Sequence, residues 1–196
     1  MADRVATIER KTKETDIKIS LSLDGSGKSS ISTGVGFFDH MLESFARHGL
    51  FDLDISCVGD LNVDCHHSVE DVGIALGEAF KKALGDKAGI KRFGSCTLPM
   101  DDALILCAVD LSGRPFFASD INLNCPKLGD MNSEMVREFF YAFSSAAGAN
   151  MHFVQHRGEN GHHIAEACFK SLAKALDAAV GYDPRVTEVW STKGML

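Results

Sequence analysis

A repeated segment constrains the fold of this chain more than any other feature of its sequence. Residues 66–85 read HHSVEDVGIALGEAFKKALG and residues 162–181 read HHIAEACFKSLAKALDAAVG, so that seven of twenty positions are identical at an offset of 96. Residues 23–27 (LDGSG) resemble residues 109–113 (VDLSG) at an offset of 86, and Phe45 matches Phe143 at 98. A twofold repeat is too short for a solenoid, and it therefore predicts one compact, pseudo-symmetric domain.

Each copy has the same predicted order of elements. In residues 1–88, the first repeat, hydrophobic spacing predicts strands near residues 17–23 and 53–58 and helices near 37–48 and from residue 66. In residues 89–183, the second repeat, it predicts strands at 103–109 and 150–155 and helices at 133–147 and 162–180. The predicted class is an α/β fold, an α+β sandwich in which each repeat is a small mixed sheet with two helices. Residues 184–196 form a predicted irregular tail.

The composition excludes several classes of protein. The 196 residues include 20 Lys and Arg against 27 Asp and Glu, a net charge of −7, and 45% are hydrophobic. The chain is too apolar for disorder, has no apolar run of about 20 residues for a membrane span, and is acidic, which argues against a nucleic-acid groove. Six cysteines contain no CxxC pair. We therefore expect a cytoplasmic protein with free thiols, without nucleic acid or membrane as a partner.

Histidines and acids at helical spacing suggest metal binding. Glu70 lies three and four residues after His67 and His66, and Glu166 stands in the same relation to His163 and His162. Residues with this spacing share one helix face and can reach one divalent ion. Adjacent histidines point about 100° apart, so that each pair would serve two metals. A nitrogen and oxygen donor set suits Mn, Fe or Zn. The alternative is that such histidines are ordinary core or surface residues.

Other single residues carry a weaker signal. Cys65 is a possible ligand, but a buried thiol is the simpler interpretation, and His152 and His156 are equally ligands or polar residues of a sheet edge. The separated basic residues of an acidic protein are normally solvated surface charges. The chain contains neither a P-loop nor a GxGxxG segment.

Short stretches over nearly the whole chain carry a more specific signal. They are residues 10–15 (RKTKET), 23–27 (LDGSG), 36–42 (GFFDHML), 46–49 (ARHG), 66–71 (HHSVED), 91–95 (KRFGS), 110–115 (DLSGRP), 158–167 (GENGHHIAEA) and 191–194 (STKG). Each stretch alone is unspecific. The ordered set resembles imidazoleglycerol-phosphate dehydratase, a family of histidine biosynthesis.

The resemblance implies a reaction and an assembly. The reaction is the dehydration of D-erythro-imidazole glycerol phosphate to imidazole acetol phosphate. The resemblance also implies two Mn²⁺ ions per active site, and sites built between subunits of a homo-oligomer of 24 chains. This chain has no room for the phosphatase domain fused to some relatives, so we expect a monofunctional hydro-lyase.

The chemistry explains why such a reaction would need metals. The hydrogen lost from C2 of the substrate is not acidic, and the leaving hydroxyl is on C3 beside the ring. If two metals bind the ring nitrogens, the ring can become an imidazolate, expel the hydroxyl and leave a diazafulvene, which acidifies the C2 hydrogen. A carboxylate must then move protons. The resemblance suggests Glu14, Glu70 and Glu166 for this, and Asp101 less strongly.

The same resemblance suggests the substrate-binding residues. Arg and Lys side chains would bind the phosphate, Arg through its planar fork. The expected substrate-binding set is Glu14, His40, His48, Arg92, Arg114, Lys170, Ser191, Thr192 and Lys193. Lys170 lies one helical turn after Glu166, and the tail that carries residues 191–194 would close over the bound substrate.

One position departs from the family pattern. Relatives commonly have a histidine ligand 24 residues before the second histidine pair, where this chain has Glu138; a carboxylate can replace imidazole at manganese. We expect one metal to be bound by His40, His67 and Glu70 and the other by Glu138, His163 and Glu166. The side chains of His66 and His162 would be ligands shared between neighbouring chains. Alternatively, Glu138 pairs with Arg137 or solvent, and His152 or His156 supplies the ligand.

Two other functions compete with the dehydratase. One is a di-metal oxidase or hydrolase built on a helical bundle, against which the alternating strands argue. The other is a metal-storage or structural metal module with the same ligands, which leaves Glu14 and the separated basic residues without a role.

Overall fold

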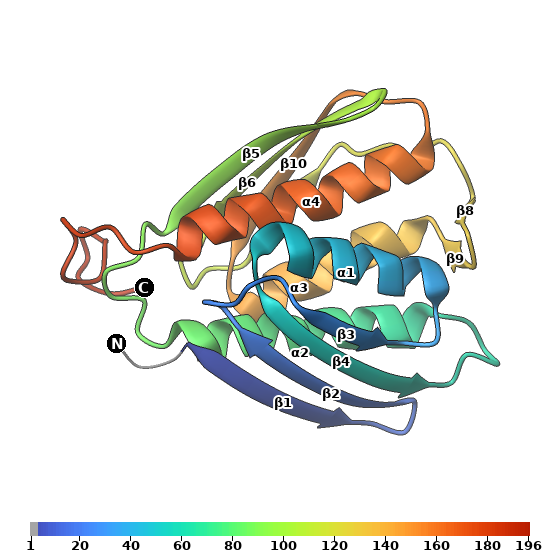
Figure 1. The fold of residues 1–196 in the computed structure, drawn as a ribbon, viewed down its shortest axis with the longest axis horizontal. Coiled ribbons are helices and arrows are strands. Elements are labelled where there is room, and N and C mark those ends of the chain that lie inside the picture. The colour runs from blue at the N-terminus through green and yellow to red at the C-terminus, as the bar shows by residue number, and fades with distance from the viewer. Residues whose placement is uncertain (1–3) are drawn as a thin grey trace.

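The two repeats fold into the same order of elements in the computed structural model, which describes residues 4–196 (Figure 1). The first repeat contains β1 (Val5–Lys11), β2 (Thr15–Ser22), β3 (Ser29–Ser32), α1 (Gly36–Gly49), β4 (Asp52–Gly59) and α2 (His66–Leu84). The second contains β5 (Phe93–Met100), β6 (Ala103–Asp110), β7 (Phe116–Ser119), β8 (Lys127–Leu128), β9 (Met131–Asn132), α3 (Glu134–Ala147), β10 (Asn150–Arg157) and α4 (Gly161–Val180). The β8–β9 hairpin is the insertion that distinguishes the second repeat within the described chain.

Strand order shows the pseudo-symmetry directly. The first sheet has the order β1-β2-β4-β3, and the second has β5-β6-β10-β7, the equivalent strands in the equivalent places. Leu21 pairs with Leu53 in the first sheet, as Val109 pairs with Met151 in the second. By these registers, each residue of β1, β2 and β3 corresponds to the residue 88 positions later in the chain. Each residue of β4 corresponds to the residue 98 positions later. The sequence alignment of residues 23–27 with 109–113 at 86 is therefore wrong by two residues.

The four helices lie between the two sheets (Figure 1). Helix α2 packs against β1 and β2, and α4 packs against β5 and β6. The remaining two helices cross between the repeats, since α1 packs on α4 and α3 packs on α2. The predicted α/β sandwich is confirmed, and both repeats share one hydrophobic core.

Aromatic packing fills the layer between the sheets. Seven fully buried phenylalanines come from both repeats: Phe38, Phe45, Phe51, Phe80, Phe139, Phe143 and Phe169. Phe80 of the first repeat meets Phe143 of the second at 5.3 Å between ring centroids, in the edge-to-face geometry that aromatic pairs favour. Burial of this size stabilises the contact between repeats, because each large side chain leaves water on folding.

Two polar caps fix the helix ends that carry functional side chains. The Asn160 side chain accepts hydrogen bonds from the backbone N–H groups of His162 and His163, at the start of α4. Asp130, in the β8–β9 hairpin, accepts from the N–H groups of Gly36 and Phe37 at 2.7 and 3.0 Å. The hairpin of the second repeat therefore holds the start of α1 in the first.

The tail after α4 folds onto the segment that joins the repeats. The N–H of Gly89 donates to Glu188, and isolated bridges join Ala88 to Val189 and Ile90 to Tyr182. Closure of this tail over a substrate stays a prediction. None of the described helices is long and apolar enough to cross a membrane.

Close packing of α2 on α3 generates a prediction for stability. A Cβ atom on Gly77 would lie 2.6 Å from the carbonyl oxygen of Phe143, so that Gly77→Ala must push two helix backbones apart. We expect a loss of about 1–3 kcal/mol in the free energy of unfolding, measured by urea denaturation. The exposed neighbour supplies the control, because Glu78→Ala should change stability by less than about 0.5 kcal/mol. Equal stability of the Gly77 variant and the parent would contradict the close contact.

Candidate functional site

Three side chains from the two repeats meet where α1 crosses α4. His40 of α1 and His162 and Glu166 of α4 each present a ligand atom, and these atoms lie within 4.8 Å of one another. His162 Nε2 is 3.2 Å from Glu166 Oε2. Both imidazoles are exposed, whereas Glu166 is buried. This group of two nitrogens and one carboxylate has the composition and spacing of a divalent metal site.

Lys170 provides the positive charge beside Glu166. Its Nζ lies 2.6 Å from Glu166 Oε1, one helical turn along α4. Burial by itself would raise the pKa of Glu166, but the hydrogen bond and charge of Lys170, with smaller effects of His40 and His162, lower it overall. His48, in the last turn of α1, has its pKa lowered by burial and by the charge of Lys170. The structure therefore places His48 and Lys170 on the same α1–α4 seam as the His40 group.

The first repeat presents a looser counterpart of this group. His66 Nε2 is 3.7 Å from Glu70 Oε2 on α2. Glu138, on α3, occupies the position equivalent to His40, and its ion pair is with Arg137 at 3.4 Å. That contact is the one expected if Glu138 is a surface acid, and its role as a ligand stays a prediction.

The predicted division of ligands between the metals differs from the arrangement in the chain. The sequence grouped His40 with His67 and Glu70, but the structure places His40 beside His162 and Glu166. The reason is tertiary: α1 packs on α4 of the other repeat, a pairing that local spacing does not encode. The equivalent packing of α3 on α2 favours Glu138, His66 and Glu70 as the second group.

The other histidine of each pair is oriented by a carboxylate that the sequence did not single out. His67 Nδ1 lies 3.0 Å from Asp60 Oδ2, and His163 Nδ1 lies 2.6 Å from Asp102 Oδ1. The hydrogen bond with Asp60 raises the pKa of His67. Asp102 also accepts from the backbone N–H groups of Asn160 and Glu159, which together with His163 lower its pKa. Such contacts fix the ring and leave Nε2 free to bind.

Two of the predicted catalytic acids lie beside these Nε2 atoms. Glu14 Oε1 is 3.8 Å from His67 Nε2, and Asp101 Oδ2 is 3.4 Å from His163 Nε2. Both carboxylates are more than half exposed. At the offset of 88 residues, Glu14 is the counterpart of Asp102. An alignment of the two repeats at this offset would have pointed to Asp102 from the sequence.

A separate cavity brings together most of the predicted phosphate-binding residues. It has a volume of about 230 Å³ and is lined by Arg92, Phe93, Arg114, Trp190, Ser191, Thr192 and Lys193. The guanidinium of Arg92 already holds Asp110 through Nε and Nη2 at 2.6 and 3.0 Å, and its Nη1 donates to the carbonyl of Trp190. Arg92 therefore shapes the cavity, whereas Arg114 and Lys193 have no salt bridge among the described residues.

The His40 group and this cavity lie near opposite ends of α4. The backbone N–H of Arg92 donates to Ala179 near the end of the helix, whereas Glu166 lies near its start. Thirteen residues of helix separate these positions, about 20 Å at 1.5 Å per residue. A molecule the size of a short phosphorylated imidazole cannot span both places in one chain.

Comparison with known proteins gives a consistent result over the whole chain. The imidazoleglycerol-phosphate dehydratase family matches residues 33–176. An imidazoleglycerol-phosphate dehydratase of Lachnoclostridium phytofermentans is 59% identical over 98% of both chains, and one of Agrobacterium fabrum is 53% identical over all of both chains.

Solved structures agree with the sequence comparison. The enzyme of that name from Staphylococcus aureus, 36% identical, superposes with a TM-score of 0.83 over 91% of this chain and 99% of its own. The one from Pyrococcus furiosus, in complex with (S)-C348, is 38% identical, with a TM-score of 0.82 over 96% and 100%. The ordered sequence stretches, the duplicated sandwich and these comparisons show that the chain belongs to the imidazoleglycerol-phosphate dehydratase family, a family of hydro-lyases.

Proposed function

We propose that this chain removes water from imidazole glycerol phosphate to give imidazole acetol phosphate in histidine biosynthesis, with two Mn²⁺ ions per active site. The observation that carries the proposal is the meeting of His40, His162 and Glu166, in a chain of this family. Two imidazole nitrogens and a carboxylate oxygen, without a thiolate, fit manganese. Glu138, His66 and Glu70 are proposed to hold the second ion, because α3 packs on α2 as α1 packs on α4.

The ions would supply Lewis-acid charge to the imidazole ring of the substrate when bound. The residues of the chain do the rest. Lys170 keeps Glu166 ionised, because its ammonium lies 2.6 Å from the carboxylate and the pKa of Glu166 is lowered. Asp60 and Asp102 orient His67 and His163, and an oriented ring loses less freedom on binding.

The proton balance requires an exposed carboxylate near the ring. The reaction removes a hydrogen from C2 and a hydroxyl from C3, which leave together as water, and the resulting enol becomes the ketone. Glu14 suits the removal of the C2 proton, since its carboxylate is half exposed beside His67 Nε2. Asp101 stands in a similar place beside His163 and is the second candidate.

The phosphate is proposed to bind in the cavity near the far end of α4. Arg114 and Lys193 supply positive charge, and Ser191 and Thr192 supply hydroxyl donors. Arg92 positions this group through Asp110 and the carbonyl of Trp190.

The separation of the two places supports sites shared between chains. Because about 20 Å of helix lies between Glu166 and the cavity, the substrate must use one of these from a neighbouring chain. Adjacent histidines point about 100° apart, so His67 and His163 are free to serve ions held by other chains. We propose a homo-oligomer, the 24 chains of the resemblance being the assembly expected.

The function itself has a direct test. Purified protein freed of metal by chelation should be inactive, and added Mn²⁺ with imidazole glycerol phosphate should produce imidazole acetol phosphate, detected as the ketone. Glu166→Gln should lower turnover, because the amide is a weaker ligand. Failure of the fully metallated parent to form the ketone would contradict the proposal.

The phosphate-binding proposal predicts a split between binding and metal content. Arg114→Ala and Lys193→Ala each remove a charged contact worth about 1.5–3 kcal/mol, so KM should rise roughly 10- to 100-fold. Manganese content, measured by atomic absorption, should stay at the parent value. Lys81→Ala, at an exposed position of α2, is the matched loss of charge and should leave KM unchanged. Loss of manganese at unchanged KM would assign these residues to the metal site.

Glu138 has an equally specific test. Glu138→Ala should lower the metal content by one ion per chain and remove most activity, because it deletes the proposed carboxylate ligand. Arg137→Ala removes the ion-pair partner of Glu138 and should leave both ions bound. Full metal occupancy in the Glu138 variant would show that this residue is a surface acid.

A further inference from the structure

Asp71 is a buried carboxylate that the proposed reaction does not use. It follows Glu70 on α2 and is only 7% exposed. Its Oδ1 accepts hydrogen bonds from Nε and Nη2 of Arg10 at 3.0 and 2.8 Å, and its Oδ2 accepts one from the Thr15 hydroxyl at 2.6 Å. Burying a carboxylate is costly unless such partners hold it. These three side chains, the Asp71 group, therefore depend on one another.

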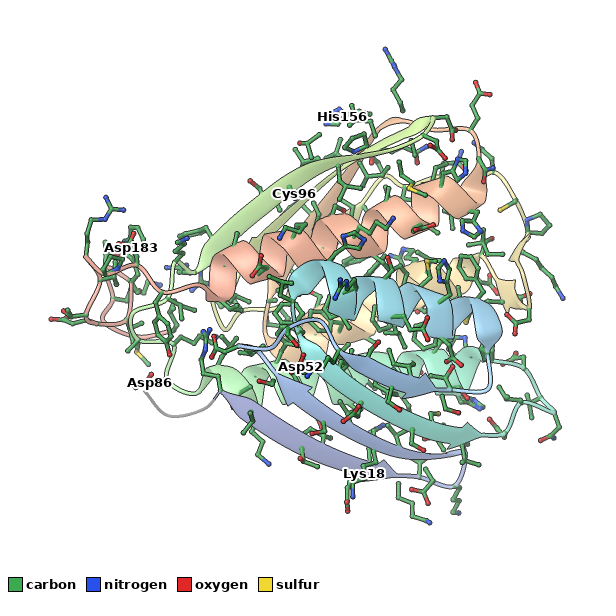
Figure 2. All side chains as sticks on the ribbon, in the orientation of Figure 1. Lys18, Asp52, Asp86, Cys96, His156 and Asp183 are labelled. Carbon is green, nitrogen blue, oxygen red and sulfur yellow. The ribbon has the colours of Figure 1, made fainter. Side chains whose placement is uncertain are left out.

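Both partners of Asp71 come from the sheet that α2 covers. Figure 2 shows Lys18 on the outer side of the first sheet. The preceding residue, Ile17, and its cross-strand partner Arg10 therefore face inward, toward α2. Thr15 begins β2, directly after the turn that connects β1 to β2. The Asp71 group therefore ties α2 to this hairpin.

The turn of the hairpin carries Glu14, the proposed base. Its carboxylate is more than half exposed and lies 3.8 Å from His67 Nε2, too far for a hydrogen bond. The position of the carboxylate therefore depends on the backbone of the turn. The Thr12 hydroxyl shapes that backbone, because it accepts from the N–H groups of Glu14 and Thr15 at 3.1 and 3.0 Å. Thr15 in turn connects the backbone of Glu14 to the Asp71 group.

A second contact joins the turn to the oriented histidine. The N–H of Asp60 donates to the carbonyl of Glu14 at 3.1 Å, and the carboxylate of Asp60 holds His67. Asp71 lies one helical turn after His67 on the same helix. The turn is thus held at two points close to His67, which fixes the backbone of Glu14 relative to that imidazole.

The duplication provides an internal comparison. In the second repeat the three positions of the Asp71 group are all apolar: Leu98 for Arg10, Ala103 for Thr15 and Ala167 for Asp71. The acid equivalent to Glu14 is Asp102, which is itself bound by two backbone N–H groups just before α4 and by His163. The polar group is therefore kept in the repeat whose turn carries a free carboxylate, and replaced in the repeat whose carboxylate is already held.

We infer that the Asp71 group is a positioning group for Glu14, which holds the carboxylate where it can take the proton from C2 of the substrate. In that step the proton moves to Glu14, and the electron pair of the C–H bond forms the carbon–carbon double bond of the enol. The group acts through the backbone of the turn. The competing interpretation is that Asp71 supports Glu70 and so a bound ion, which predicts a loss of metal.

The inference rests on the proposed function, and its first test changes a single hydroxyl. Thr15→Val keeps the size of the side chain and removes the hydrogen bond to Asp71, whereas Thr15→Ser keeps the hydroxyl. A misplacement of about 1 Å can cost roughly 100-fold in rate. The kcat of Thr15→Val should therefore fall roughly 10- to 100-fold, and Thr15→Ser should stay near the parent value. Thr7→Val makes the same change at an exposed position of β1 and is the matched control.

The measurements are kcat, KM and manganese content per chain for the parent and these three variants. Only kcat should change, and unchanged manganese also shows that Thr15→Val is folded, because an unfolded chain has no preformed metal site. Loss of manganese, a rise in KM at the parent kcat, or equal kcat in Thr15→Val and the parent would each overturn the inference. A parent that forms no ketone would overturn the proposed function as well, whereas an active parent with an unaffected variant overturns this inference alone.

A second variant gives the first repeat the arrangement of the second. Arg10→Leu, Thr15→Ala and Asp71→Ala together remove both charges, so that no unpaired charge stays buried, and the equivalent turn already tolerates this apolar set. The triple variant should bind manganese as the parent does and lose at least as much kcat as Thr15→Val. Its control, Lys11→Leu with Asp16→Ala, removes the exposed ion pair beside the same turn. Parent kcat in the triple variant, or the same loss in the control, would contradict the positioning role.

Discussion

The candidate site depends on the crossed packing of helices between the repeats. His40 reaches His162 and Glu166 because α1, which also contacts β3 and β4 of its own sheet, packs on α4 of the other repeat. The buried phenylalanines of both repeats hold that crossing in place. A half-chain would expose the apolar faces of two helices and would lose the three-residue group together with its core. Stability and the proposed metal site therefore rest on the same contact, which favours keeping the two repeats in one compact domain.

The sequence predicted the elements that carry strong periodicity and missed those that do not. Helices α2 and α4 were placed by their histidine pairs and their apolar spacing. The edge strands β1 and β5 were missed, because an edge strand buries little, and β5 contains Gly94 and Pro99. The meeting of His40 with His162 and Glu166 in one chain was not predicted, for a different reason. Which helix packs on which is decided by long-range contacts, and spacing along one helix contains no information about it.

The two repeats have diverged where the molecule meets its surroundings and have kept what builds the interior. The core registers agree residue by residue between the sheets, as Ile55 and Phe153 do opposite Ile19 and Cys107. At two cross-strand pairs, the charged Glu9–Lys18 and Lys11–Asp16 of the first sheet correspond to the uncharged Thr97–Leu106 and Pro99–Leu104 of the second, with no change in strand order. The helix faces show the same division, because the histidine pairs and their glutamates persist while His40 is matched by Glu138. Packing therefore fixes the fold, and the surfaces are free to specialise.

The ring orientation of His67 and His163 is the same kind of feature in both repeats, although different residues provide it. Asp60 holds His67 from the end of β4, whereas Asp102 holds His163 from the turn between β5 and β6. These aspartates are not equivalent in the duplication, since the register makes Asp102 the counterpart of Glu14. Inheritance from a common half would have preserved one position in both. Two different positions supplying the same carboxylate to the same Nδ1 atom argue instead that the ring orientation itself is constrained. Such a constraint follows if Nε2 must meet a ligand in a fixed direction, because a freely rotating ring would lose that geometry.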